Sequence, residues 1–83
     1  MSRPVKRSLT LKGHRTSVTL EDAFWQAFRE IAAQQDRAIN DLAAEIDAAR
    51  DLDTGLATAI RLFVLDHYRQ AAIHRRGTDV TPT

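Results

Sequence analysis

The chain opens with two short segments in which polar and apolar side chains alternate. In Ser17-Val18-Thr19-Leu20 every second residue is apolar, which predicts a half-buried strand over residues 15–20. Ser8-Leu9-Thr10-Leu11 repeats the alternation, and a short stretch around Gly13 separates the two segments. Residues 5–11 are therefore either an additional strand or part of a flexible basic arm that covers residues 1–14.

Beyond residue 20 the apolar spacing changes to that of amphipathic helices. A first helix begins at Glu21 or Asp22, where acids complement the positive end of the helix dipole, and ends near Gln35. A second helix begins near Ala38. The apolar residues that share a face are, in the first helix, Phe24, Phe28, Ile31 and Ala32 and, in the second, Ile39, Leu42, Ala43, Ile46 and Ala49.

A third helix is predicted over residues 54–75, after a break at 51–55 that contains Gly55. One face of this helix is apolar, and Leu62 and Leu65 lie on another face. A helix that is apolar on two faces needs a partner surface. Residues 76–83 are polar, and we expect them to form a flexible tail.

Charge is distributed unevenly along the 83 residues. Residues 1–20 contain five basic residues and no acid, residues 21–53 contain nine acids and three arginines, and residues 54–83 contain four arginines and two acids. A basic segment attached to an acidic body is typical of proteins that bind a polyanion.

Other features narrow the class of protein. The chain has no cysteine and no apolar leader segment, so we expect a cytoplasmic protein without disulfides, metal or cofactor and without a membrane partner. Its length leaves little room for a dry cleft, and no nucleophile lies beside a base in the sequence. We therefore do not expect an enzyme.

A strand over residues 15–20 requires a hydrogen-bonding partner. Unless residues 5–11 provide it, the same strand of a second copy is the simplest partner. This reasoning predicts a homodimer held by a two-stranded antiparallel ribbon.

Two groups of residues resemble a known family. The strand reads Arg15-Thr16-Ser17-Val18-Thr19-Leu20, an amphipathic helix follows, and the next helix opens with Arg37-Ala38-Ile39-Asn40. This order resembles the Arc-type ribbon-helix-helix DNA-binding proteins. In that family the apolar residue that ends the strand lies twenty positions before the start of the second helix, as Leu20 lies twenty positions before Asn40. His14-Arg15-Thr16-Ser17 and Ala44-Glu45-Ile46-Asp47 resemble a short bacterial subgroup. The resemblance implies a mainly α fold, with one strand that pairs with its dimer mate, a core over residues 15–50 and an additional C-terminal helix. Many members carry glycine where this chain has Asp36.

The resemblance also implies roles for individual residues, because the ribbon of this family enters the major groove of double-stranded DNA. The outward residues of the strand would contact bases: Arg15, Ser17 and Thr19. Residues of the arm and of the start of the second helix would contact phosphates: Lys6, Arg7, Lys12, Arg37, Ile39 and Asn40. The apolar positions would form the dimer core: Val18, Leu20, Phe24, Phe28, Ile31, Ile39, Leu42 and Ile46.

The function that these expectations favour is a sequence-specific DNA-binding homodimer that represses transcription. An antitoxin-like module, which binds a partner protein through its C-terminal helix, is an alternative, and so is a protein-interaction dimer that does not bind DNA. One structural alternative also stays open. The segment 57–64 resembles the second helix of other ribbon-helix-helix proteins, in which case residues 37–53 are an inserted helix and residues 54–57 meet the phosphate.

Overall fold

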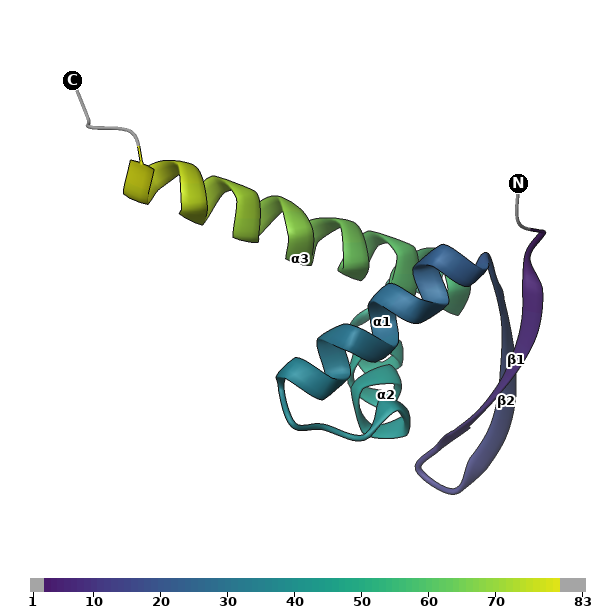
Figure 1. Ribbon diagram of the computed structural model, residues 1–83. Coiled ribbons are helices and arrows are strands. Elements are labelled where there is room, and N and C mark those ends of the chain that lie inside the picture. Colours follow the sequence, from purple (N-terminus) through teal and green to yellow (C-terminus); the bar gives the residue numbers. More distant parts are fainter. Residues whose placement is uncertain (1–2, 80–83) are drawn as a thin grey trace.

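The computed structural model describes residues 3–79, and the side chains of residues 3–73. Two strands, β1 (Val5–Leu11) and β2 (His14–Leu20), precede three helices, α1 (Asp22–Gln34), α2 (Ile39–Ala49) and α3 (Leu56–Asp79). Figure 1 shows a curved hairpin along one side of the helices and α3 projecting toward the other side. The predicted order of a strand followed by three helices is confirmed.

The hairpin lies within a single chain, so β1 provides the partner for one edge of β2. β2 pairs antiparallel with β1, and Ser8 lies opposite Ser17. Lys12 and Gly13 have φ angles of 51° and 83°, the left-handed conformations that a two-residue type I′ turn requires. Because this turn folds residues 5–11 back onto β2, one edge of β2 already has a partner within the chain, and pairing of its other edge with a dimer mate stays a prediction. Residues 5–11 are thus a strand and not part of a flexible arm.

Helix α1 ends in a Schellman motif. Asp36 adopts a φ of 55°, its N–H donates to the carbonyl of Ala33, and the N–H of Arg37 donates to the carbonyl of Ala32. Glycine is the usual residue at such a left-handed position, and aspartate tolerates it better than most other residues do. The turn expected at Asp36 therefore forms without a glycine.

Helix α3 is longer than expected. It runs to Asp79, so residues 76–79, which were assigned to a flexible tail, continue the helix. A helix of this length extends about 36 Å. Its first half packs against α1, α2 and β2, and the described side chains from Tyr68 to Ile73 are exposed. The expected tail residues 80–83 lie outside the described residues.

The core lies between the inner face of the hairpin and the three helices. Its twelve buried residues are all apolar, and among the described residues no polar side chain is buried. They are Leu9, Leu11, Val18, Leu20, Phe28, Ile31, Ala32, Leu42, Ala43, Ile46, Ile60 and Val64. One chain thus encloses a continuous core to which every element contributes.

Candidate nucleic-acid interface

The hairpin turns one polar face to solvent. Because side chains alternate along each strand, the residues that face away from the helices are all exposed, and the buried residues of the hairpin, Leu9, Leu11, Val18 and Leu20, all lie on the inner side. We call the exposed set the outer face; its opposing pairs are Lys6 with Thr19, Ser8 with Ser17, and Thr10 with Arg15. The predicted positions of Arg15, Ser17 and Thr19 on one side, and of Val18 and Leu20 on the other, are confirmed.

The outer face combines two cations with four hydroxyl groups. Lys6 lies near the open end of the hairpin, and Arg15 lies on the other strand beside the turn. Lys12, exposed in the turn itself, adds a third cation at that end. A guanidinium, an ammonium and hydroxyls are the groups that donate to base edges and phosphates.

Arg7 does not share this face. It lies on the inner side of β1, where its Nη2 donates to Oδ1 of Asp22 at 3.1 Å. Its guanidinium carbon also lies 5.4 Å from the centre of the Trp25 ring. Arg7 therefore connects β1 to α1, whereas its neighbour Lys6 points to solvent.

The N-terminus of α2 lies beside the hairpin. The first hydrogen bond within α2 runs from the N–H of Leu42 to the carbonyl of Ala38, and no side chain caps this end. The amides of Ile39 and Asn40 thus belong to the first turn, which has no acceptor within its own helix. The side chain of Asn40 points back to β1, where its Oδ1 accepts the main-chain N–H of Thr10 at 3.1 Å.

Arg37, the other cation expected at this helix end, pairs with an acid on the next turn of α2. Its Nη2 lies 2.7 Å from Oε2 of Glu45. This hydrogen bond lowers the pKa of the Glu45 carboxyl and raises the pKa of Arg37. The ion pair thus favours the charged form of both groups and holds Arg37 close to α2.

The residues expected in a dimer core lie in the core of the single chain. Six of them are buried, and Phe24 and Ile39 are half-buried beside them. Their packing within one chain agrees with their apolar periodicity. A role between two copies stays a prediction.

One residue that the sequence interpretation missed binds the opposite edge of the hairpin. Arg61 of α3 donates from Nη2 to the carbonyl of Thr19 at 3.3 Å and from Nε to Oε1 of Glu21 at 2.9 Å. These two bonds join residues 42 and 40 positions apart in sequence. In the sequence, the only local indication of such a role is that Arg61 is a single cation within the apolar run of α3.

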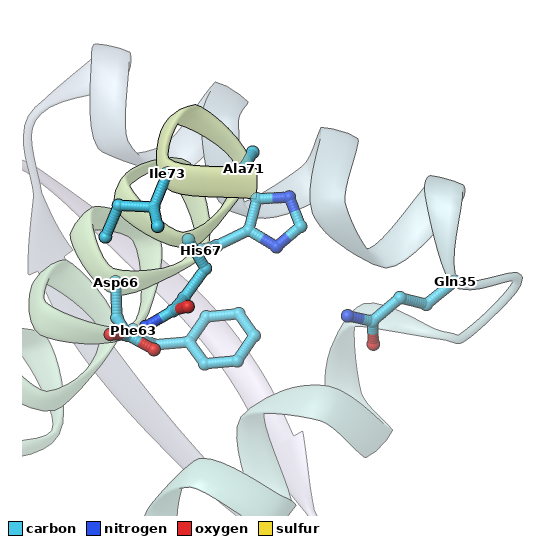
Figure 2. A pocket seen from close by; sticks show the side chains of 7 residues that line it. Gln35, Phe63, Asp66, His67, Ala71 and Ile73 are labelled. Atoms are coloured by element: carbon cyan, nitrogen blue, oxygen red, sulfur yellow. The ribbon is translucent and has the colours of Figure 1, made fainter. Parts of the chain in front are cut away.

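A separate hollow lies away from the hairpin, between α3 and the end of α1. Figure 2 shows Phe63, His67 and Ala71 along α3 and Gln35 across from them. The hollow has a volume of about 700 Å³ and a mainly apolar lining. Among the described residues, no cluster of three or more metal-ligating side chains occurs, there or elsewhere. Over the same described part, no helix has the length and apolar character that a membrane span needs.

Comparison with known proteins agrees with this geometry. Residues 4–68 match the family described as the ribbon-helix-helix domain. No curated protein and no solved structure matches the chain. Members of the family are in general DNA-binding or regulatory proteins that dimerise, and they are typically not enzymes. The match covers more than three quarters of the chain and includes the hairpin, so the chain belongs to the ribbon-helix-helix family.

Proposed function

We propose that this protein is a homodimer that binds double-stranded DNA in a sequence-specific manner and represses transcription. The observation that carries the proposal is the outer face, where Lys6, Arg15 and four hydroxyls are exposed on one side of a two-stranded ribbon. A ribbon of this kind fits the major groove, in which each base pair presents a distinct pattern of donors and acceptors. Occupation of that groove at a promoter would exclude other proteins.

We propose that the second copy pairs along the outer edge of β2. Hydrogen-bonded and non-hydrogen-bonded pairs alternate along an antiparallel ladder, and Leu11 and His14 flank the two-residue turn. The pair that flanks a two-residue turn is hydrogen-bonded, so Arg15 and Ser17 belong to the non-hydrogen-bonded pairs. Their main-chain N–H and C=O groups consequently point away from β1. Two copies joined there would form a four-stranded sheet in the order β1, β2, β2, β1, with the two β2 strands at its centre.

The width of such a sheet assigns different roles to the two strands. Neighbouring strands lie about 4.8 Å apart, so four strands span roughly 14 Å, and the major groove is about 12 Å wide. The central β2 pair would lie over the base edges, with Arg15, Ser17 and Thr19 as the base contacts. The outer β1 strands would lie near the groove walls, where Lys6 meets phosphates and Lys12 extends this contact at the turn.

The first turn of α2 is our candidate for a further phosphate contact. The unpaired N–H groups of a helix N-terminus attract an anion, here those of Ile39 and Asn40, with the Arg37 cation nearby. The hydrogen bond between Asn40 and Thr10 supports α2 over α3 in this role, because it keeps that helix end beside the hairpin. Asp36 and Asp41 lie close by in sequence and would weaken the contact.

Arg15 offers the sharpest test, because it is the long donor on the outer face of β2. A duplex is first selected from a random pool with the wild-type chain. Arg15→Ala should then weaken binding to that duplex by roughly 1–3 kcal/mol for each guanine that the arginine binds, and it should change binding to a scrambled duplex much less. Arg29→Ala, a charge-matched change on the exposed side of α1, is the control. Failure of the wild-type chain to enrich any duplex would contradict the proposal.

A second candidate function rests on α3. Leu62, Leu65, Tyr68 and Ile73 are exposed on this helix, and an exposed apolar row is typical of a surface that binds another protein. An antitoxin-like module or a protein-interaction dimer without DNA binding would use this row. Leu62→Glu combined with Leu65→Glu would then abolish complex formation with the partner protein. In the antitoxin-like module, which also binds DNA, the same variant would leave a gel shift with the selected duplex unchanged.

A further inference from the structure

Two side chains from different helices bind the two outer edges of the hairpin. Asn40 of α2 accepts the main-chain N–H of Thr10 at 3.1 Å, and Arg61 of α3 donates to the main-chain carbonyl of Thr19 at 3.3 Å. Thr10 lies on β1 beside the turn, and Thr19 lies on β2 beside α1. Both threonines belong to the outer face, so each hydrogen bond acts on the backbone of a residue of the candidate interface.

The other forces on the hairpin do not define its orientation as closely. The ladder between β1 and β2 fixes the strands relative to each other. Besides the ion pair of Arg7 with Asp22, the hairpin meets the helices through the apolar side chains of its inner face, such as Leu9 and Val18, and burial of apolar surface is not directional. Two directional hydrogen bonds, at opposite edges and opposite ends, therefore restrict rotation of the hairpin about its long axis.

Arg61 is itself held in place. Its Nε donates to Oε1 of Glu21 at 2.9 Å, and its guanidinium carbon lies 5.9 Å from the centre of the Phe24 ring. Glu21 is the residue between β2 and α1. Arg61 thus joins α3 to the corner at which the hairpin meets the helices.

We propose that Asn40 and Arg61 are positioning residues, which set the orientation of the outer face for contact with base edges. The proposal rests on the DNA-binding function proposed above. A bidentate hydrogen bond to a base requires its donors within about 0.5 Å and 10–20° of the correct geometry. Rotation of the hairpin on the helices breaks such hydrogen bonds, whereas the attraction between Lys6 and a phosphate tolerates small rotations.

The experiment combines amide hydrogen exchange with binding measurements on the full chain. Asn40→Ala should accelerate exchange of the Thr10 amide by about tenfold or more, because the amide then has no acceptor. The ratio of affinities for the selected and scrambled duplexes should fall about tenfold in both Asn40→Ala and Arg61→Ala, which corresponds to about 1.4 kcal/mol. Asn40→Ala keeps the main-chain N–H that belongs to the candidate phosphate contact, so it should lower affinity for the scrambled duplex less than affinity for the selected duplex, since only base contacts depend on the orientation. Arg61→Ala also removes a cation, so Arg29→Ala serves as its charge-matched control.

Asn40→Asp provides the rescue. The carboxylate keeps an acceptor for the Thr10 amide, so the slow exchange of that amide should return to its wild-type rate. The ratio of affinities for the selected and scrambled duplexes should also return to its wild-type value, because the added charge weakens binding to both duplexes alike. Unchanged exchange of Thr10 in Asn40→Ala, or an unchanged affinity ratio in both alanine variants, overturns the positioning roles and leaves the proposed function standing. If the wild-type chain selects no duplex, both proposals fail.

Discussion

Ser8 and Ser17 lie directly opposite each other across the hairpin, and both side chains are exposed on the outer face. Because the ladder alternates outward from the turn, the main-chain N–H of each residue points away from the partner strand. Ser8 presents its N–H at the edge of β1, and Ser17 presents its N–H at the edge of β2. The two serines are thus equivalent within the chain and differ only in which edge they face.

This equivalence allows a matched test of the dimer. Proline removes the N–H, and it is tolerated in a strand where that N–H faces an open edge. Ser17→Pro should therefore leave the hairpin of one chain intact and prevent pairing with a second copy, so that the variant sediments as a monomer. Ser8→Pro should sediment as the wild-type dimer. If Ser17→Pro stays dimeric and folded, the second copy does not pair along β2.

Lys6 and Arg7 are neighbours in the basic segment, yet they face opposite sides of β1. Lys6→Ala should weaken binding to all duplexes and reduce the slope of log K against log salt by about 0.9 for each phosphate that the lysine neutralises. Arg7→Ala should leave the slope unchanged and lower the free energy of unfolding by about 1 kcal/mol, since it removes the interactions with Asp22 and Trp25. Salt titrations and urea denaturation of both variants check this contrast. Equal salt slopes in the two variants would contradict the separation of their roles.

The two strands of the hairpin illustrate how much of the structure the sequence could predict. The alternation that buries Val18 and Leu20 is local, and it predicted the two sides of β2 correctly. Applied to β1, it turns Arg7 inward only if residues 5–11 are known to be a strand, and that depends on the turn at Lys12 and Gly13. The hydrogen bonds of Arg61 with Thr19 and Glu21 join residues 42 and 40 positions apart. No local pattern contains such interactions, because they depend on how α3 packs against the hairpin.

Asp36 combines a strained backbone with an unfavourable charge. A left-handed conformation costs a residue other than glycine roughly 1–2 kcal/mol, so Asp36→Gly should raise the free energy of unfolding by about 1 kcal/mol. If the first turn of α2 contacts a phosphate, removal of the acid should also strengthen binding to every duplex. Asp36→Asn separates the two effects, because asparagine tolerates the left-handed conformation and carries no charge. It should strengthen binding with a smaller gain in stability, as urea denaturation and gel shifts would measure.

The ion pairs of Glu21 and Glu45 predict how stability depends on pH. Hydrogen bonds from Arg61 and Arg37, respectively, lower the pKa of each carboxyl below its usual value of 4.5. Because each pKa is lower in the folded state than in the unfolded state, the unfolded chain binds more protons as the solution becomes acidic. The stabilisation is therefore complete above pH 4.5 and disappears as the pH falls through the folded values.

Glutamine at both positions keeps an oxygen that accepts a hydrogen bond from the arginine, but it removes the carboxyl group that titrates. In Glu21→Gln combined with Glu45→Gln, the urea midpoint should fall less steeply between about pH 5 and about pH 3 than in the wild-type chain, and the variant should be less stable at neutral pH. Glu30→Gln, on the exposed side of α1 and outside the four ion pairs of the described residues, should retain the wild-type dependence. A double variant with the full wild-type slope would mean that other carboxyls cause the loss of stability in acid. The ion pair of Arg61 with Glu21 would then contribute little to the attachment of the hairpin.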